Sequence, residues 1–450
     1  MSTTIEFLEE LPGGSERIRE PGVNPDHLHV TDPSHGEVVV SVVGDDAASI
    51  AASIDRAEVG QRAWAERTAY ERGEALLGTA AGIREHLEEL ASVMTTETGK
   101  PLRESRGEWA AAANVFEWSA EEGKRLYGRI VPSRIPSRRI MVIKQPVGIV
   151  ATITAWNFPA ILPARKWAAA MAAGCAVLGR PSGRTPLSAL AMTGLAHRAG
   201  VPDDVLQVII APGALGAEAF IEDPRIRVMS FTGSEETGAA LVARGAMTHT
   251  EVRLELGGSA PVVVLGDADP DRAAELSVGA KFRNAGQVCI SPSRFLVASE
   301  ISKEFVEAIT ARIDRLRVGP GGDEQTDVGP VIDETAIGRL DDLVGSAVRE
   351  GAQLVRGGKR IDRAGTYFEP TLLDGVGNDD RISRDEIFGP VLPVGHVRST
   401  AEALVRANDT RYGLAAYVHT QDLDRAVWFA ERLEAGIVGI NDMVPATAEA

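Results

Sequence analysis

Short runs rich in valine and isoleucine alternate with helix-like segments from about Gly148 onward, and this alternation restricts the fold more than any other feature of the sequence. The runs are GIVATIT, AVL, VLQVII, IRVMSF, VRLEL and PVVVL, and segments such as Leu187–Arg198 lie between them. Strands that alternate with helices form a parallel sheet covered by helices on both faces. The pattern therefore predicts an α/β fold, whose ligands bind at the carboxyl ends of the strands.

A second alternating region follows Cys289 and continues to Leu433. Its first helix is predicted to be amphipathic, with an apolar face formed by Phe305, Ile309, Ile313 and Leu316. A single hydrophobic core stops growing at ~250–300 residues, and this chain has 450. We therefore expect two α/β domains.

Two further segments precede the first sheet. Apolar residues spaced alternately by four and three predict one long helix over Leu76, Ala80, Ile83, Leu87, Leu90 and Met94. Gly99 and Pro101 are expected to end it. The prolines and extended runs of Tyr127–Val147 predict a β-hairpin that stands apart from both domains. Such a hairpin is either an arm for subunit contact or an edge of a monomer.

The charge and the cysteine count limit the partners and the location. The chain has 64 acidic and 47 basic residues, so its net charge of -17 argues against a nucleic acid or an anionic membrane as partner. The simplest explanation of the excess of acidic residues is a charged, soluble surface. The start, MSTTIEFLEELPGG, lacks a secretory pattern, and the apolar run Trp167–Gly179 is shorter than the ~20 residues of a membrane span. With only 2 cysteines, we expect a reducing, cytoplasmic location.

Four loops after predicted strands carry residues suited to ligands. Asn157 follows GIVATIT and is either a turn residue or a side-chain amide aimed at a developing oxyanion. Arg180, Ser182 and Gly183 follow AVL and offer a cation, a hydroxyl and an open position for a ribose or phosphate. By itself that second signal is weak, because a strand-to-helix turn needs proline and glycine anyway.

The third and fourth loops follow IRVMSF and VRLEL. Gly233 and Ser234 open a predicted helix over Glu235–Arg244, whose backbone amides suit a pyrophosphate, although Ser234 also reads as an ordinary N-cap. Glu255 ends its strand either as a solvated carboxylate or as a poised base. No Gly-x-Gly-x-x-Gly fingerprint follows a strand, so any dinucleotide binds in a less common way.

Cys289 lies in the polar stretch KFRNAGQVCIS and either fills a core position or does chemistry. A free thiol has a pKa near ~8.5, so an environment that favours the thiolate makes a cysteine a strong nucleophile toward a carbonyl carbon. Cys175, in AAGCAVL, is most simply a packing residue. The eight histidines show no metal-ligand spacing, so no metal is predicted.

Taken together, the motifs WNFP, FTGS, ELGG, GQVCIS and EIFGP occur in the order of the aldehyde dehydrogenase superfamily, which this chain resembles from Glu97–Pro101 onward. The resemblance implies two doubly wound α/β domains and a β-hairpin oligomerisation arm. The expected boundaries are 1–120 and 146–255 for the dinucleotide-binding domain, and 256–433 for the catalytic domain. Residues 121–145 and 434–450 would form the arm of a homodimer or homotetramer.

The resemblance also implies the reaction, which is the NAD(P)-dependent oxidation of an aldehyde to a carboxylic acid. Cys289 attacks the aldehyde carbon, and the Asn157 amide and the Cys289 backbone N–H stabilise the oxyanion, each such donor being worth ~3–4 kcal/mol. Loss of a hydride to the nicotinamide leaves a thioester on Cys289. Glu255 then activates the water that hydrolyses it, and such assistance contributes ~100–10,000-fold.

The same resemblance assigns the cofactor residues. In the family pattern Glu386 holds the nicotinamide ribose and Phe388 packs near the ring, although Phe388 also suits core packing. The full expected set is Trp156, Asn157, Arg180, Ser182, Gly183, Gly233, Ser234, Leu256, Glu386 and Phe388.

Two departures from the family pattern bear on the cofactor and the assembly. The family usually has Lys at position 180, and many NAD-using members have Glu at position 183 to bind the adenosine ribose. Arg180 and Gly183 stand here, and a guanidinium suits a 2'-phosphate, so we favour NADP over NAD; Arg180 equally suits a ribose hydroxyl. The chain stops at NDMVPATAEA, where the family continues, so we expect an incomplete C-terminal part of the arm or a shortened form.

The substrate prediction depends on Arg165 and Arg283. Through RKWAAAMAAGC and KFRNAGQ the chain most resembles the succinate-semialdehyde dehydrogenase subgroup, in which arginines at these positions bind the distal carboxylate of the substrate. Alternatively, both are surface arginines paired with local acids. Glutarate semialdehyde and non-acidic aliphatic or aromatic aldehydes remain alternative substrates. Ser291 stands where the subgroup can carry a second cysteine, so a disulfide switch is not expected.

Two rival functions fit the motifs less well. A cysteine hydrolase needs a histidine partner, and neither His249 nor His419 falls in a recognisable motif. A non-catalytic family member has no physical need to keep Cys289, Glu255 and Asn157 together. We therefore expect an enzyme that acts on a small aldehyde.

Overall fold

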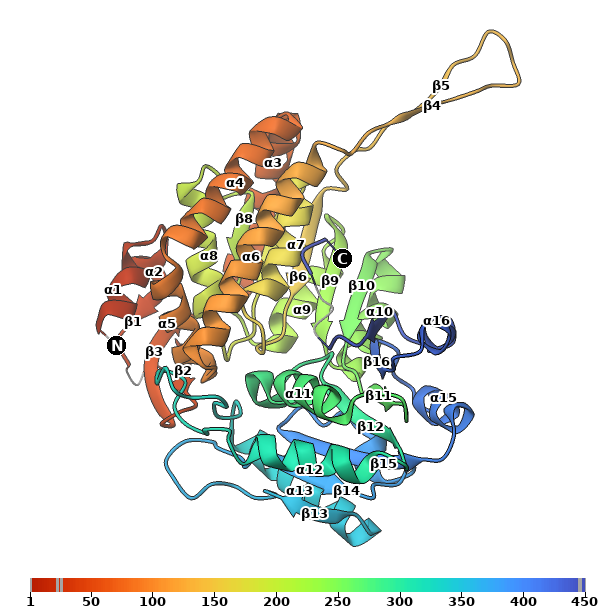
Figure 1. Ribbon diagram of the computed structural model, residues 1–450. Helices are drawn as coiled ribbons and strands as arrows, with labels where there is room; N and C mark the ends of the chain where they lie inside the picture. The colour runs from red at the N-terminus through yellow and green to blue at the C-terminus, as the bar shows by residue number, and fades with distance from the viewer. Residues whose placement is uncertain (1, 22–23, 25–26, 444–446, 450) are drawn as a thin grey trace.

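The structure is a computed structural model that describes residues 2–21, 24, 27–443 and 447–449. Within these residues the strands form four sheets. The smallest are an antiparallel sheet near the N-terminus and a two-stranded hairpin. The other two are large and lie beside one another, so the molecule has two α/β halves (Figure 1).

The first large sheet has five parallel strands in the order β10-β9-β6-β7-β8. Every residue of β6 is buried, as expected for a strand covered on both faces. From β6 the chain adds strands in one direction and then returns to the other side of β6 at β9. The switch point of this sheet therefore lies between β6 and β9. The strands are β6 (Ile149–Ile153), β7 (Ala176–Arg180), β8 (Leu206–Val208), β9 (Ile226–Gly233) and β10 (Glu251–Leu256).

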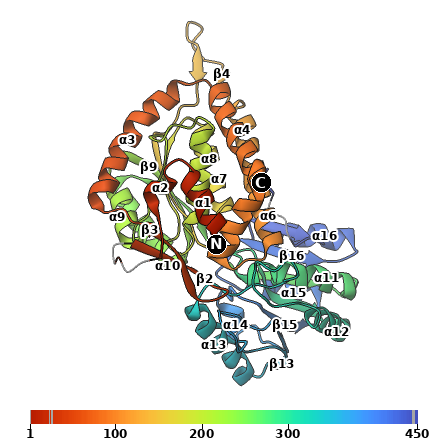
Figure 2. The same cartoon turned by 90° about the vertical axis from the view of Figure 1, so that its left-hand side faces the viewer.

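Helices cover both faces of the first sheet, and Figure 2 shows α3 (Ala47–Glu66) and α4 (Ala69–Glu85) on opposite sides of it. One face packs against α3, α9 (Gly213–Glu222) and α10 (Glu235–Thr248). The other packs against α7 (Ile161–Ala172) and α8 (Leu187–Arg198). Both of these helices contact α4, and α7 also contacts α6 (Leu102–Gly123). The helix predicted over Leu187–Arg198 is confirmed.

The single helix predicted over Leu76–Met94 is wrong. The segment forms α4 (Ala69–Glu85) and α5 (Leu87–Thr98), with His86 between them at a non-helical φ of -107° and ψ of 30°. Both helices bury their apolar residues in the same core, so the apolar spacing continues across the break and does not reveal it. Gly99, in the left-handed conformation at φ 75°, ends α5 as expected.

The remaining N-terminal elements lie against this core. Helix α6 (Leu102–Gly123) packs on α4, α5 and α7. The small antiparallel sheet has the order β1-β3-β2. These elements are α1 (Ser2–Glu10), α2 (Gly14–Arg17), β1 (Ile18–Arg19), β2 (His27–Asp32) and β3 (Glu37–Val43).

The predicted hairpin is present and extends away from both halves (Figure 1). Strands β4 (Arg129–Val131) and β5 (Ile140–Val142) pair antiparallel. The side chains of Ile130 and Met141 are 76% and 73% exposed, so apolar surface faces outward here.

The second large sheet has seven strands in the order β13-β14-β15-β12-β11-β16-β17, and only β13 runs antiparallel to its neighbour. The run PVVVL, which continues the alternation of the first sheet along the sequence, lies in this sheet as β11, on the catalytic side of the expected boundary at 256; only three residues separate it from β10. β17 lies in the segment 434–450 that was assigned to the arm, yet it extends this sheet; residues 444–446 and 450 of that segment lie outside the described residues. The strands are β11 (Ala260–Val264), β12 (Pro292–Ala298), β13 (Gln353–Arg356), β14 (Thr371–Asp374), β15 (Val391–Val397), β16 (Ala415–His419) and β17 (Ile437–Ile440).

Helices also cover both faces of the second sheet. One face packs against α11 (Pro270–Lys281), α12 (Ser302–Ile313) and α13 (Glu334–Glu350), and the other against α15 (Thr400–Asn408) and α16 (Leu423–Ala430). Leu316, predicted to belong to the face of α12, lies beyond its end but still packs against the core. Short helical turns occur at η1 (Arg283–Gly286) and α14 (Arg381–Arg384). Among the described residues no helix is both long and apolar enough to cross a membrane.

Candidate active site

A cavity of about 400 Å³ lies where the two halves meet. The first sheet contributes residues at the carboxyl ends of β6, β9 and β10, beside its switch point, which is where ligands of such sheets bind. The second sheet contributes loops at the amino ends of β12 and β15. Of the expected site residues, the cavity is lined by Trp156, Asn157, Gly233, Ser234, Glu255, Leu256, Cys289, Glu386 and Phe388.

The Cys289 thiol is held in the loop before β12. The Tyr417 hydroxyl donates to the backbone oxygen of the next residue, Ile290, over 2.6 Å. Gly258 lies against the Cys289 backbone, because a β-carbon at Gly258 would come within 2.6 Å of the Cys289 carbonyl oxygen. Neighbours on both sides therefore fix the position of this loop.

The surroundings of Cys289 disfavour its thiolate, contrary to the environment anticipated for a reactive thiol. Burial raises the pKa of Cys289 strongly, and the Glu255 and Glu386 carboxylates raise it further. The thiol is therefore protonated at neutral pH, and its proton must move to a base before the sulfur can attack. Of these two carboxylates, Glu255 acts on the thiol more strongly, and it lines the same cavity.

Glu255 ends β10 and faces both the cavity and the thiol. Burial raises the pKa of Glu255, whereas the Cys289 thiol and the Lys166 ammonium oppose that rise. Burial in turn lowers the pKa of Lys166 to about 8, and Lys166 donates to the Ser230 hydroxyl over 2.8 Å. Oε2 of Glu255 is buried without a hydrogen-bond partner at bonding distance, as is the hydroxyl of Thr232 beside it. Such a carboxylate is suited to accept a proton.

The Asn157 side chain is buried and reaches across to the cysteine loop. Its Nδ2 donates to the backbone oxygen of Gln287 over 3.0 Å. Gln287 is only two residues before Cys289. The Asn157 amide therefore contacts the same short loop that carries the backbone N–H of Cys289. An amide carries two N–H groups, so one remains to face the cavity.

Glu386 lies opposite, in the loop before β15. Its Oε1 accepts the backbone N–H of Gly258 over 3.1 Å. Burial raises the pKa of Glu386, while that N–H and the Arg339 guanidinium oppose the rise. Gly257 is needed here because a β-carbon at this position would come within 2.6 Å of Oε2 of Glu386. The carboxylate is thus aimed into the cavity as an acceptor.

The Phe388 ring meets the Trp156 ring edge to face, with centroids 5.4 Å apart. Phe388 has a left-handed backbone, at φ 46°, which is strained for a bulky residue. Arg339 holds this loop by donating to the backbone oxygens of Glu386, Ile387 and Phe388, over 2.7, 2.5 and 3.1 Å. Phe388 therefore lines the cavity and does not fill a core.

These residues fit a nicotinamide dinucleotide. Glu386 offers carboxylate acceptors for ribose hydroxyls, and the amides at the start of α10, beside Gly233 and Ser234, suit a pyrophosphate. The partnerless hydroxyl of Thr232 lines the same cavity and is available to a ligand.

Three of the expected cofactor residues, Arg180, Ser182 and Gly183, are not among the described residues that line the cavity. Arg180 donates through Nε and Nη2 to the backbone oxygen of Ala211, over 3.2 and 3.0 Å, and lies over Gly216 at the start of α9. Burial lowers the pKa of Arg180. Gly183 lies beneath Leu28, whose side chain a β-carbon would approach to 2.7 Å. Ser182 accepts the backbone N–H of Arg184 over 3.3 Å. Their cofactor roles stay predictions.

The two predicted substrate arginines lie apart from this lining. Arg283 stacks on the Phe158 ring, 5.0 Å from its centroid. Arg165 donates to the backbone oxygen of Thr447, and the Glu255 and Glu449 carboxylates act on it electrostatically. The carboxylate clamp stays a prediction.

Sequence reasoning missed several residues of the site. Gln287 and Thr232 lie inside the motifs GQVC and FTGS, so a signal for them existed. Arg339 and Asp333 come from α13 and its N-cap, which no motif marks. The described residues contain no cluster of three or more histidine, cysteine or acidic side chains that would hold a metal ion. Cys175 is buried, as expected for a packing residue.

A thiol beside a carboxylate and an amide, at the switch point of a doubly wound sheet, suits a cysteine-dependent enzyme that binds a dinucleotide. The comparison with known proteins defines the class further. The chain belongs to the aldehyde dehydrogenase family, whose model, described as "Aldehyde dehydrogenase family", matches residues 21–450. It is therefore an NAD(P)-dependent oxidoreductase that converts aldehydes to carboxylic acids.

Relatives with known names are similar over most of their length. The NADP(+)-dependent succinate-semialdehyde dehydrogenase of Escherichia coli strain K12 is 42% identical over 419 residues, which is 93% of this chain and 87% of that protein. The glutarate-semialdehyde dehydrogenase of Pseudomonas putida KT2440 is also 42% identical over 419 residues, with the same coverage. A crystal structure of an NADP-dependent E. coli enzyme superposes with a TM-score of 0.93 at 41% identity, covering 94% of this chain and 88% of that one. The predicted aldehyde dehydrogenase fold is confirmed.

Proposed function

We propose that this enzyme oxidises succinate semialdehyde to succinate through a thioester on Cys289, and that it prefers NADP to NAD. The observation that carries the proposal is that the Cys289 thiol, the Glu255 carboxylate and the Asn157 amide line one cavity. The E. coli and P. putida relatives are named for aldehydes that carry a second, acidic end. A substrate of this kind gives Arg165 and Arg283 an anion to bind.

The first step forms the bond between sulfur and the aldehyde carbon. The thiol proton passes to Glu255 as the sulfur attacks, and the carbonyl oxygen becomes an oxyanion. Asn157 Nδ2 and the backbone N–H of Cys289 stabilise it. A bound nicotinamide would supply a hydride acceptor, and Glu386 and Phe388 would hold it. As the carbonyl reforms, the C–H bond of the former aldehyde carbon breaks with loss of a hydride, and the carbon keeps its bond to sulfur and becomes a thioester.

The second step releases the acid. Glu255 first releases to solvent the proton that it took from the thiol. It then accepts a proton from a water molecule, whose oxygen attacks the thioester carbon and displaces the Cys289 sulfur, and that proton passes on to the sulfur. The products are the carboxylic acid and the free cysteine. Lys166 supports this step, because its positive charge lowers the pKa of Glu255 and so favours the carboxylate that acts as base.

The NADP preference rests on Arg180 and Gly183. Arg180 is a partly buried guanidinium that donates to a neutral carbonyl, that of Ala211, and a 2'-phosphate would supply a negative charge for it to bind. Gly183 brings no carboxylate to repel that phosphate.

The rival cysteine hydrolase loses support. His419 lines a different cavity from Cys289, and among the described residues no histidine lines the cavity of Cys289. We further infer a cytoplasmic homodimer or homotetramer, supported by the exposed apolar side chains of the β4–β5 hairpin.

The test follows the absorbance of reduced cofactor with NADP and with NAD, using succinate semialdehyde, glutarate semialdehyde, propanal and benzaldehyde. We expect the highest kcat/KM with succinate semialdehyde and NADP, and no turnover by the Cys289→Ala variant. Equal kcat/KM for propanal would remove the arginine clamp. Ester turnover without nicotinamide would instead favour the hydrolase.

A further inference from the structure

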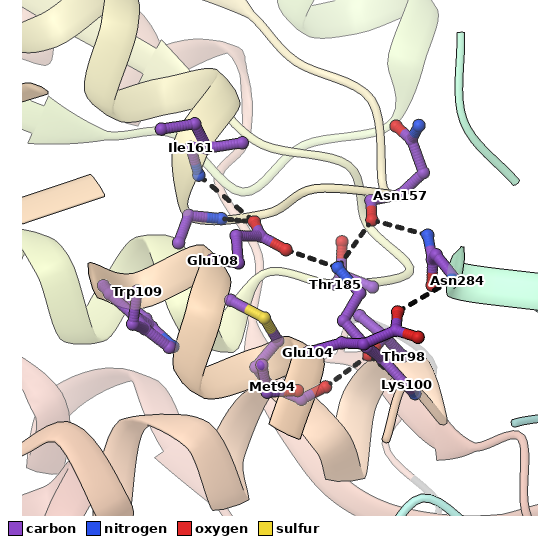
Figure 3. Close-up of polar contacts among 12 residues, drawn as sticks. Met94, Thr98, Lys100, Glu104, Glu108, Trp109, Asn157, Ile161, Thr185 and Asn284 are labelled. Atoms are coloured by element: carbon purple, nitrogen blue, oxygen red, sulfur yellow. Dashed lines mark hydrogen bonds and ion pairs between the residues drawn. The ribbon is translucent and has the colours of Figure 1, made fainter. Parts of the chain in front are cut away.

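A charged cluster at the start of α6 lies beneath the cavity and outside its lining. It consists of Lys100, just before the helix, and of Glu104 and Glu108 in its first two turns. The Lys100 ammonium forms an ion pair with Glu108, and their side chains are only 1% and 3% exposed. Figure 3 shows the three side chains pointing toward the loops of Asn157 and Asn284. We call these three residues the α6 cluster.

Lys100 and Glu108 hold the loop that carries Asn157. Lys100 Nζ donates to the backbone oxygen of Asn157 over 3.0 Å, so the backbone of this residue is fixed while its side chain is turned away from Lys100 (Figure 3). Glu108 Oε1 accepts the backbone N–H groups of Ala160 and Ile161, over 2.9 and 3.2 Å. One buried ion pair therefore holds both the middle of the loop between β6 and α7 and the junction of that loop with α7.

Glu104 holds the loop that leads to Cys289. Its Oε2 accepts the backbone N–H of Asn284 over 2.7 Å. Asn284, Ala285 and Gly286 are all left-handed, with φ of 49°, 52° and 74°, and two of them are not glycine. Such a turn costs energy for residues with a β-carbon, so it needs outside contacts to persist. Glu104 supplies one of them.

The two loops are also joined to one another above the cluster. Asn284 Nδ2 donates to the backbone oxygens of Asn157 and Gln287, over 3.0 and 3.2 Å. Asn157 Nδ2 donates to the same oxygen of Gln287. Lys100 and Asn284 therefore share one acceptor, the Asn157 carbonyl, and the contacts run without a gap from α6 to the residue two before Cys289.

We propose that Lys100, Glu104 and Glu108 are positioning residues, which set the separation between the Asn157 amide and the backbone N–H of Cys289. The inference rests on the proposed role of these two groups in stabilising the oxyanion. A buried ion pair adds little stability compared with an apolar pair of the same shape, so its main effect here is on geometry. Misplacing a reacting group by about 1 Å costs roughly 100-fold in rate.

The main variant is Lys100→Met, which keeps the length of the side chain and removes its ammonium. The matched control is Lys124→Met at the far end of the same helix, where the ammonium pairs with the exposed Glu121. We measure the single-turnover rate of cofactor reduction at saturating aldehyde. We expect it to fall on the order of 10- to 100-fold for Lys100→Met, with cofactor Kd within about twofold of the wild type, and to stay unchanged for Lys124→Met.

A double-mutant comparison separates positioning from general damage. If Lys100 acts through Asn157, adding Lys100→Met to Asn157→Ala causes little further loss. Multiplicative losses, or a normal rate in Lys100→Met, would overturn the inference. An Asn157→Ala enzyme with a normal rate would instead overturn the proposed oxyanion role, so the two failures are distinct.

Glu104→Ala provides a second route if Lys100→Met does not fold. It removes the acceptor for the Asn284 N–H and leaves the Lys100–Glu108 ion pair in place, and Glu104 is partly exposed. We expect a slower single turnover, and again little additional loss in the Asn157→Ala background. A rate equal to that of the wild type in folded Glu104→Ala protein would contradict the inference.

Discussion

The carboxylate of Glu386 occupies the space that a side chain at Gly257 would need. A β-carbon on Gly257 would come within 2.6 Å of Oε2 of Glu386, and the adjoining N–H of Gly258 already donates to Oε1. Gly257 and Gly258, which link the two sheets, therefore leave room for the Glu386 carboxylate on the cofactor side of the cavity.

Gly257→Ala is expected to displace Glu386 and to raise the KM for NADP roughly tenfold, the cost of about one hydrogen bond to a charged group. The KM for the aldehyde should change less, because Glu386 is assigned to the cofactor. Steady-state kinetics with each substrate varied in turn provide the check. Gly338→Ala in α13, where a β-carbon meets nothing within 4 Å, is the control. An unchanged KM for NADP would contradict the assignment of Glu386.

Arg339→Met is expected to lower stability and to weaken cofactor binding together. Its guanidinium donates to three consecutive carbonyls, which keep Phe388 in a left-handed conformation. Loss of these bonds should cost about 2–3 kcal/mol of unfolding free energy, measured by denaturant unfolding. Arg339→Lys keeps the charge but not the planar fork, so it should recover only part of the loss. Full recovery by lysine would mean that charge alone holds the loop.

Glu255→Gln is expected to make Cys289 more reactive toward iodoacetamide at pH 8 in the absence of cofactor. The negative charge of Glu255 raises the pKa of Cys289, so removing it lowers that pKa and increases the thiolate fraction. The alkylation rate should rise roughly tenfold for each unit by which the pKa falls. Deacylation should be slow in the same variant. Slower alkylation would instead show that the proton transfer to Glu255 in the proposed first step outweighs the effect of its charge on the pKa of Cys289.

Lys166→Met is expected to shift the acid limb of the kcat profile to higher pH. The Lys166 ammonium lowers the pKa of Glu255, so without it Glu255 stays protonated, and inactive as a base, up to a higher pH. The pKa of Lys166 is about 8, so its charge is present throughout the acid range in the wild type. Lys166→Arg keeps the charge and should leave the limb in place. An acid limb at the same pH in all three proteins would exclude this coupling.

Met141→Asp tests whether the hairpin mediates assembly. Met141 is exposed on β5, so a buried subunit interface there would not accept a charge. We expect a smaller species by size-exclusion chromatography with light scattering. Ser137→Asp, in the exposed loop between the two strands, is the control for added charge. The same mass for wild type and Met141→Asp would argue against the arm.

The sequence predicted the strands and their loops well, because buried parallel strands such as β6 are short apolar runs with clear ends. It failed where one residue or a few decide the outcome. His86 breaks a helix without interrupting its apolar spacing. The alternation of runs likewise does not mark the change of sheet between β10 and β11, which only the resemblance located, at residue 256.

The candidate site was predictable where it follows strands of the first sheet, as at Glu255. The second half contributes the amino ends of its strands, so the rule about carboxyl ends gives no reason to place Cys289 or Glu386 there; only the resemblance did. Arg339 and Lys166 act through contacts with residues distant in the chain, and no local pattern encodes them. The pKa of Cys289 likewise depends on two carboxylates from separate loops.

The bond between Glu104 and Asn284 joins residues 180 positions apart. During synthesis on the ribosome, α6 emerges long before its partner exists, so the first half of the chain must keep an incompletely satisfied acidic group until the second half arrives. Contacts of such wide sequence separation slow folding and prolong the life of partly folded chains. The loop that carries the nucleophile therefore assembles late. A nascent chain whose synthesis stops before residue 289 contains α6 but not the catalytic cysteine.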